Sequence, residues 1–258
     1  MAKPRVAFFD FSCCEGCQLT VSNCEDELLA LVSHIDIVTF REIMTERSDN
    51  YDIAFIEGSC TREEEIPRLQ KIRDAATVVI ALGACSAIGG VNCLKNFHDP
   101  EWVGREVYGD KAHYFPSFEA RPIDQVIKVD YYLHGCPIDR GEFLSLVKSL
   151  LLGIEFRPAD YPVCVQCRMK ENVCLFTQGH VCLGPIARAG CGAICPEFGD
   201  RCVACRGTVT SPNLPYMIAV LHEHGLSYEE ARKMTGMFLG YRKFQDQIQQ
   251  AENASLAD

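Results

Sequence analysis

Residues 77–90 read TVVIALGACSAIGG, an apolar run that leads directly into a glycine, a cysteine and a pair of glycines. The run Val78–Leu82 is apolar at every position and rich in β-branched residues, which is typical of a parallel strand covered on both faces. Similar runs lie before and after it, separated by segments with helical spacing. This alternation predicts an α/β fold built on a doubly wound parallel sheet. The expected strands are Val6–Phe9, Ile35–Phe40, Ile53–Ile56, Val78–Leu82 and Val129–Leu133.

Three segments carry the apolar spacing of helices that would cover this sheet. The first extends over Val21–Val32, the second is centred on Ile66–Ile72, and the third is Gly141–Ile154. Each places its apolar residues on one face at a helical period. Together with the strands, these helices predict the flavodoxin-like form of the doubly wound fold, with Gly141–Ile154 as its closing helix.

Residues 157–162, RPADYP, mark a domain boundary because two prolines within five residues interrupt both helix and central strand. We therefore expect a flavodoxin-like domain over residues 1–157 and a smaller domain over residues 158–258. Between residues 164 and 205 the second domain is rich in cysteine, glycine, proline and small polar residues. Such a segment predicts a small irregular domain whose core is bound metal. C-terminal helices are expected at 211–224 and 227–244, and the polar residues 245–258 are expected to fray.

The composition is that of a soluble globular protein. The chain has 258 residues, of which 48% are hydrophobic and 23% charged, and its formal net charge is −10. This acidic balance disfavours binding to nucleic acid, which requires clustered Lys and Arg. No apolar run approaches the roughly 20 residues that a membrane span needs. The N-terminal residues resemble no export leader, so we expect a cytoplasmic protein whose cysteines stay reduced rather than forming disulfides.

Four of the 16 cysteines lie just beyond predicted strand ends. The motif Cys14-Glu-Gly-Cys17 follows the first strand, Cys85 follows Val78–Leu82, and Cys136 follows the last strand. Because ligands bind at the carboxyl edge of open α/β sheets, these four thiols are expected to meet in one crevice and hold a metal cluster. Ordinary buried cysteines are the alternative interpretation. Tandem Cys13 could replace Cys14 as a ligand, but the C-x-x-C spacing favours Cys14.

Eight further cysteines fall within residues 164–205, with the spacing C-x2-C-x6-C-x7-C-x8-C-x3-C-x6-C-x2-C. Eight thiolate ligands suit two metal sites of four ligands each. Structural zinc is the alternative, because C-x2-C pairs also suit tetrahedral zinc. The Cys195-Pro196 pair and the irregular spacing favour iron–sulfur clusters. The eight are Cys164, Cys167, Cys174, Cys182, Cys191, Cys195, Cys202 and Cys205.

The combination of motifs resembles the small subunit of nickel–iron hydrogenases. The shared motifs are C-x-x-C after the first strand, Gly-Ala-Cys-x4-Gly-Gly at 83–90, Gly-Cys-Pro at 135–137, and CLGPIARAGC at 182–191. The resemblance spans residues 5 to about 208 and is strongest to the cytoplasmic branch that couples hydrogen to NAD(P), which includes sulfhydrogenase delta subunits.

That resemblance implies three 4Fe–4S clusters, each with four cysteine ligands. All eight positions of the second domain are cysteines here, whereas membrane-linked relatives use a histidine at one of them. His134 and His180 are therefore not expected to be ligands. The implied proximal set is Cys14, Cys17, Cys85 and Cys136; the distal set is Cys164, Cys167, Cys174 and Cys182; the medial set is Cys191, Cys195, Cys202 and Cys205.

The resemblance also implies a role in electron transfer, with no catalytic residue in this chain. The nickel–iron centre would belong to a separate large subunit. Further partners would be subunits that bind FAD or FMN and NAD(P), or a ferredoxin-like subunit; no nucleic acid and no membrane span are expected. Two alternatives stay open at this point. One is a quinone-reductase-type iron–sulfur subunit, which normally lacks anything like residues 164–205, and the other is a zinc-stabilised binding module.

Overall fold

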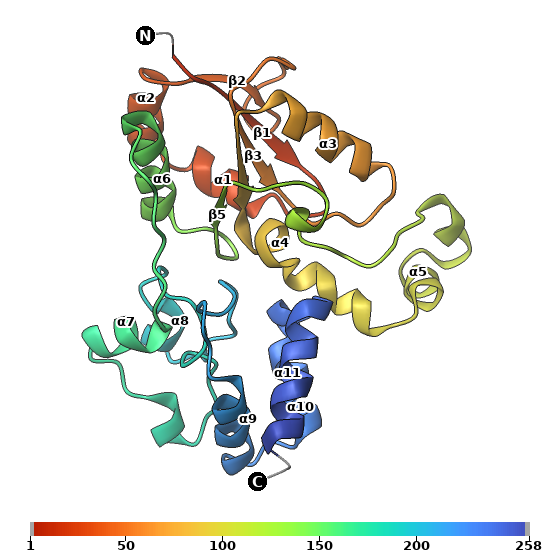
Figure 1. The fold of residues 1–258 in the computed structure, drawn as a ribbon, viewed down its shortest axis with the longest axis vertical. Coiled ribbons are helices and arrows are strands. Elements are labelled where there is room, and N and C mark those ends of the chain that lie inside the picture. The colour runs from red at the N-terminus through yellow and green to blue at the C-terminus, as the bar shows by residue number, and fades with distance from the viewer. Residues whose placement is uncertain (1–2, 256–258) are drawn as a thin grey trace. The chain divides into compact units, whose positions relative to one another are not determined.

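The computed structural model describes residues 3–255, apart from the side chains of residues 242, 243, 251, 252, 254 and 255 in the last helix. The chain divides between Arg157 and Pro158 into two compact units. Unit 1 is the part up to Arg157 and unit 2 is the part from Pro158 onward, and both are drawn in Figure 1.

Unit 1 is built on a five-stranded sheet in the order β2-β1-β3-β4-β5, and every neighbouring pair is parallel. This order is that of flavodoxin-like folds, so the predicted fold class is confirmed. The central strands are almost fully buried, as their unbroken apolar sequences predict. The strands are β1 Arg5–Asp10, β2 Asp36–Phe40, β3 Ile53–Glu57, β4 Val78–Leu82 and β5 Tyr131–Leu133.

Helices cover both faces of this sheet (Figure 1). Helices α1 and α6 contact each other and share one apolar core with the strands, while α3 lies on the opposite side. The α-helices of unit 1 are α1 Gly16–Ser22, α2 Asp26–Val32, α3 Glu65–Ala75, α4 Gly83–Ile88, α5 Pro100–Tyr108 and α6 Arg140–Leu152. Its 3-10 helices are η1 Gly90–Phe97, η2 Gly109–Tyr114 and η3 Ile123–Gln125.

One expected helix is divided into two. The apolar spacing over Val21–Val32 predicts a single helix, but α1 ends at Ser22 and α2 begins at Asp26. Glu25, directly before α2, has a φ of 46° and so leaves the helical region. The apolar spacing continues across the break, and for that reason periodicity alone does not reveal it.

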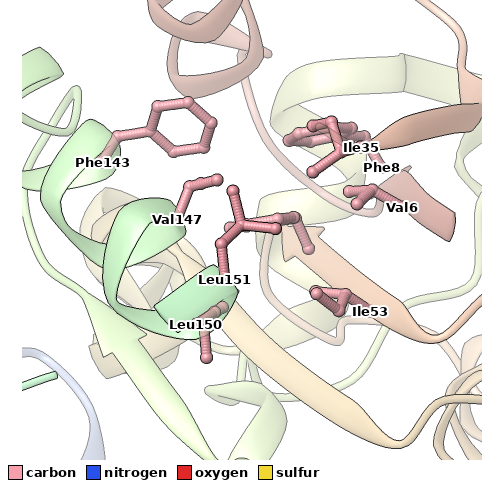
Figure 2. Close-up of a pocket in the computed structure, with 9 residues that line it drawn as sticks. Val6, Phe8, Ile35, Ile53, Phe143, Val147, Leu150 and Leu151 are labelled. Atoms are coloured by element: carbon pink, nitrogen blue, oxygen red, sulfur yellow. The ribbon is translucent and has the colours of Figure 1, made fainter. Parts of the chain in front are cut away.

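The core between α6 and the sheet consists of aromatic and aliphatic side chains. Phe8 stacks on Phe55 with ring centroids 4.8 Å apart, and Phe55 meets Phe143 of α6 at 5.6 Å. An apolar gap of about 10 Å³ remains there, and all its lining residues are hydrophobic, so it is a packing gap rather than a ligand site. Figure 2 shows Phe143, Val147, Leu150 and Leu151 of α6 on one side of the gap, with Val6, Phe8, Ile35 and Ile53 across it.

Unit 2 combines an irregular cysteine-rich segment with three C-terminal helices. The irregular segment does bury some apolar side chains of its own, including Leu183 and Ile186, so its core is not formed by metal sites alone. Ser227 and Glu230 form a capping box at the start of α10. The helices are α7 Val163–Met169, η4 Leu175–Gln178, α8 Ile194–Glu197, α9 Leu214–Glu223, α10 Tyr228–Leu239 and α11 Arg242–Ser255.

The end of the chain differs from the expectation. Residues 245–258 were expected to fray, but α11 continues to Ser255 and contacts α9 and α10. Ile248 and Gln245 are buried against this neighbourhood, which explains why the helix persists in a polar sequence. Residues 256–258 lie outside the described residues.

Candidate iron–sulfur cluster sites

The proximal set of cysteines lies at the carboxyl edge of the unit 1 sheet. Cys14 follows β1, and Cys17 is in the first turn of α1. Cys85 lies in α4, which begins directly after β4, and Cys136 lies just beyond β5. A backbone hydrogen bond of 2.7 Å from Ala84 N to Gly135 O joins the last two segments. The strand-end positions predicted for these cysteines are therefore the ones observed.

Gly83 allows two of these segments to approach closely, and Gly16 lies beside Cys14. Gly83 has a φ of 86°, and a Cβ atom there would lie 2.3 Å from the Sγ atom of Cys17. A Cβ atom on Gly16 would lie 3.4 Å from the Sγ atom of Cys14. The Cys17 thiol thus packs directly against the backbone at the end of β4, which only glycine permits.

The proximal thiols are also close enough to influence one another electrostatically. Burial raises the pKa of the Cys85 thiol to about 12, and the charges of Cys136, Cys13 and Cys14 contribute to the increase. Burial likewise raises the pKa of Cys136, with a contribution from Cys14. Several thiols gathered in a half-buried site stay protonated unless a cation binds near them. The irons of a cluster would supply that positive charge and so favour the deprotonated form of the cysteine ligands.

Cys13 lies in the same neighbourhood as Cys14. Burial raises the pKa of its thiol to about 12, with a further contribution from the charge of Glu57. The charges of both Cys13 and Cys14 raise the pKa of the Cys85 thiol, so both cysteines lie near it. The choice of Cys14 as the ligand stays a prediction.

Sequence reasoning did not identify Glu57, the last residue of β3. Its side chain is 2% exposed, and its carboxylate accepts the backbone N–H groups of Cys17 at 3.1 Å and Gln18 at 3.0 Å. Burial raises the pKa of Glu57, while these two hydrogen bonds oppose the increase. A signal was available, since a lone carboxylate ends an apolar strand just before Gly58.

The distal set gathers in unit 2. Burial raises the pKa of the Cys164 thiol to about 11, and the charges of Cys182, Cys167 and Cys174 contribute, so all four thiols share one neighbourhood. Cys182 is buried, and its Sγ atom accepts backbone N–H groups from Gly184 at 3.4 Å and Cys202 at 3.3 Å. Backbone N–H donors of this kind are common around cluster-bound sulfur.

The medial set gathers beside it. Burial raises the pKa of the Cys202 thiol, with contributions from Cys182, Cys205 and Cys191. Burial also raises the pKa of Cys195, with Cys191 as its first charged neighbour. The charge of Cys182 raises the pKa of Cys164 in the distal set and that of Cys202 in the medial set. Cys182 therefore lies where the two sets meet.

The donor set suits iron–sulfur clusters. All 16 cysteines are free thiols, and 12 of them are the residues assigned to the three predicted sets. Within residues 3–255, no group of three or more His, Cys, Asp or Glu side chains is placed to hold a single metal ion. Soft thiolate ligands in groups of four, with backbone N–H donors directed at sulfur, match what a 4Fe–4S cluster requires.

The two histidines near the cysteines occupy different surroundings. His134 stacks on Tyr132 with ring centroids 6.0 Å apart. His180 lines a hollow of about 400 Å³ in unit 2, together with Asp200, Arg201 and His224.

Comparison with known proteins places the chain in a family. Residues 14–150 match the family described as NADH ubiquinone oxidoreductase, 20 Kd subunit. The chain belongs to this family. Its sequence is also 31% identical to subunit delta of sulfhydrogenase 2 from Pyrococcus furiosus over 89% of this chain and 97% of that relative. The resemblance drawn from the cysteine motifs is therefore confirmed.

Other proteins with similar sequences are also named as hydrogenase subunits. Subunit delta of the NAD-reducing hydrogenase HoxS from Cupriavidus necator is 28% identical over 62% of this chain and 83% of that protein. A crystal structure of a NAD+-reducing [NiFe]-hydrogenase in the H2-reduced state contains a chain of the same fold. That chain has a TM-score of 0.54 and 29% identity, and the match covers 61% of this chain and 96% of that one.

Within the described part of this family member, no helix combines the length and the apolar character that crossing a membrane requires.

Proposed function

We propose that this chain is the electron-transfer small subunit of a soluble nickel–iron hydrogenase of the cytoplasm. It relays single electrons between the nickel–iron centre of a separate large subunit and a partner that binds flavin and NAD(P) or is ferredoxin-like. The observation that supports the proposal is that free thiols lie near one another at the sheet edge of unit 1, around Cys85, and in unit 2, around Cys164 and around Cys202.

The proposal assigns one 4Fe–4S cluster to each set. The proximal set in unit 1 would hold the cluster nearest the large subunit, and unit 2 would hold the medial and distal clusters. Each cluster supplies reversible one-electron chemistry, because the added electron spreads over several irons and sulfurs.

The protein's own groups position these clusters and adjust their charge. The N–H groups of Gly184 and Cys202 direct positive partial charge at the Cys182 sulfur, which favours the more negative, reduced state of a bound cluster. In unit 1 the Glu57 carboxylate binds the first turn of α1, which fixes Cys17 in position. Neither effect needs a proton transfer, so we assign no catalytic residue to this chain.

A quinone-reductase-type subunit is the second candidate, because the family takes its description from such an enzyme. That match ends at residue 150, before the distal and medial sets begin. The sulfhydrogenase relative, by contrast, aligns over 89% of the chain, which extends into the cysteine-rich segment. Unit 2 therefore favours the hydrogenase assignment.

Anaerobic purification of the chain together with its native partners tests the proposal. We expect co-purification of a nickel-containing large subunit and hydrogen-dependent reduction of a viologen dye. Mass spectrometry of the complex would identify the flavin-binding or ferredoxin-like subunits. A complex that contains no nickel and reduces a quinone with NADH instead would favour the second candidate.

A further inference from the structure

Gln166 links the distal and medial sets of cysteines through its side chain. It lies in α7 between Cys164 and Cys167 of the distal set. Its Oε1 atom accepts two backbone N–H groups, from Gly190 and from Gly192, each at 3.0 Å. These two glycines flank Cys191, the first cysteine of the medial set. One amide oxygen therefore holds the loop at residues 190–192 against helix α7.

The backbone of that loop suits a shared acceptor. Gly190 has a φ of 113° and Gly192 a φ of 64°, conformations that L side chains rarely adopt. These glycines turn the N–H groups on both sides of Cys191 toward the same oxygen. Gln166 therefore helps to set the position of Cys191 relative to Cys164 and Cys167. Backbone hydrogen bonds from Val163 N to Ala187 O and from Ala189 N to Tyr161 O, each 2.9 Å, join the same segments before Gly190.

A second contact shows how closely the two sets approach. The Cys202 N–H of the medial set donates to the Cys182 sulfur of the distal set at 3.3 Å. A Cβ atom on Gly184 would lie 3.2 Å from the Cys164 sulfur and 3.4 Å from the Cys182 sulfur. A side chain at Gly184 would therefore press against the Cys164 sulfur of the distal set.

A further link, from the residue that follows α7 to helix α8, is at the surface. Lys170 pairs with Glu197 of α8, and both side chains are about two-fifths exposed, at 41% and 42%. Exposed pairs of this kind contribute little to structure. Lys170 is therefore a matched control for Gln166, because it directly follows the same helix and contacts the same segment through a surface pair.

We infer that Gln166 is a positioning residue that fixes the separation of the distal and medial clusters, and with it the electronic coupling between them. The inference rests on the proposed function, since it requires a cluster at each set. When an electron passes between the two, one cluster is oxidised by one electron and the other is reduced by one, with no proton or further reactant. Because the rate of electron tunnelling falls steeply with distance, a loop that moves would slow this step.

Three variants of the intact, anaerobically purified complex test the inference. Gln166→Leu removes the acceptor and leaves both N–H groups without it. Gln166→Glu keeps an oxygen at the same place and strengthens its bonds to the N–H groups. Lys170→Ala removes the surface pair with Glu197 and the lysine side chain that lies beside Gly192, but it leaves both N–H groups bound to Gln166. The readouts are iron per chain and the spin–spin interaction between the two reduced clusters in electron paramagnetic resonance spectra.

The expected result is that Gln166→Leu loses the resolved spin–spin interaction, or loses medial iron as well, while Gln166→Glu and Lys170→Ala keep both. A Gln166→Leu complex with wild-type iron and an unchanged interaction would overturn the inference. So would a Gln166→Glu complex as impaired as Gln166→Leu. An absence of any iron–sulfur signal in the wild-type protein would instead reject the proposed function itself. The two failures are distinguishable, because the wild-type protein tests for the clusters and the variants test the role of Gln166.

Discussion

The carboxylate of Glu57 at the end of β3 accepts the backbone N–H of Cys17 in the first turn of α1, at 3.1 Å. The same carboxylate accepts the next N–H, that of Gln18, at 3.0 Å. Because Glu57 is 2% exposed, its carboxylate is a buried acceptor for both N–H groups. A buried residue of one strand therefore holds a predicted cluster ligand of another segment.

Replacing Glu57 with alanine is expected to leave two buried N–H donors without an acceptor. The cost to the free energy of unfolding is about 1–3 kcal/mol, and iron at the proximal set is expected to fall because Cys17 loses its support. Thermal unfolding and iron analysis of the purified complex measure both effects. Glu63→Ala is the control, since Glu63 is exposed six residues further along the chain. Wild-type stability and iron content in Glu57→Ala would contradict this role.

Gly83→Ala is expected to displace Cys17 and abolish the proximal cluster. The new Cβ would lie 2.3 Å from the Cys17 sulfur, at a φ of 86° that alanine rarely adopts. Gly109→Ala is a matched control, because Gly109 has a φ of 56° but no atom within 4 Å of the added Cβ. The control therefore carries only backbone strain, about 1–3 kcal/mol. Iron analysis should show a loss of about four irons per chain in Gly83→Ala, and equal iron in the two variants would refute the close packing.

Asp130 is expected to stabilise unit 1 equally from pH 5 to pH 8. Burial alone would raise the pKa of its carboxyl, but hydrogen bonds from Val79 N at 2.8 Å and Arg73 at 2.5 Å bring the pKa below its usual value of 3.8. The stabilisation is therefore complete above the usual pKa and is lost only as the pH falls through the lowered pKa.

Asp130→Asn should lower the free energy of unfolding by about 1–3 kcal/mol, by the same amount at pH 5, 6.5 and 8. Thermal unfolding of the complex at each pH measures this difference. Asp49→Asn is the control, because Asp49 pairs with Lys71 at the surface and is 82% exposed. A difference that shrinks toward pH 5 would mean that the pKa of Asp130 is raised, contrary to this account.

Serine substitutions at single predicted ligands should distinguish the role of the proximal cluster from that of the distal cluster. Cys136→Ser is expected to impair the proximal cluster and stop electron flow from the large subunit. Cys164→Ser is expected to spare proton–deuterium exchange at the nickel–iron centre while blocking reduction of the final acceptor. Exchange and acceptor reduction are measured on the same preparations. Equal loss of both activities in Cys164→Ser, with the complex still assembled, would contradict the proposed order of clusters.

The sheet could be predicted from sequence because its strands are buried on both faces. The run Val78–Leu82 was predicted with the bounds that the structure gives β4. The last strand is shorter than predicted and begins at Tyr131, although the Asp130 backbone N–H already donates to Val79 O of β4 at 2.9 Å. The strand-end positions of the cysteines followed from the strands, since each thiol comes within a few residues of a strand's last apolar position.

Other features depend on contacts between distant residues, and no local pattern reveals them. The Glu57 carboxylate accepts the N–H of Cys17, which is 40 residues away in the sequence. The Gln166 side chain accepts the N–H of Gly190, which is 24 residues further on. Residues 90–119 carry neither strand alternation nor a long helical period, so the sequence predicted no element there. The structure forms η1, α5 and η2 in this segment, with exposed aromatic residues such as Trp102 and Tyr114.

Iron and acid-labile sulfide analysis of the anaerobically isolated complex, combined with electron paramagnetic resonance spectra after reduction, tests the central claim most directly. Three cubane clusters predict about 12 irons and 12 sulfides for each copy of this chain, after the iron of partner subunits is subtracted, together with signals from interacting reduced clusters. Two zinc ions per chain, with no iron or labile sulfide bound to it, would show that these cysteines form a zinc-stabilised module and would contradict the account.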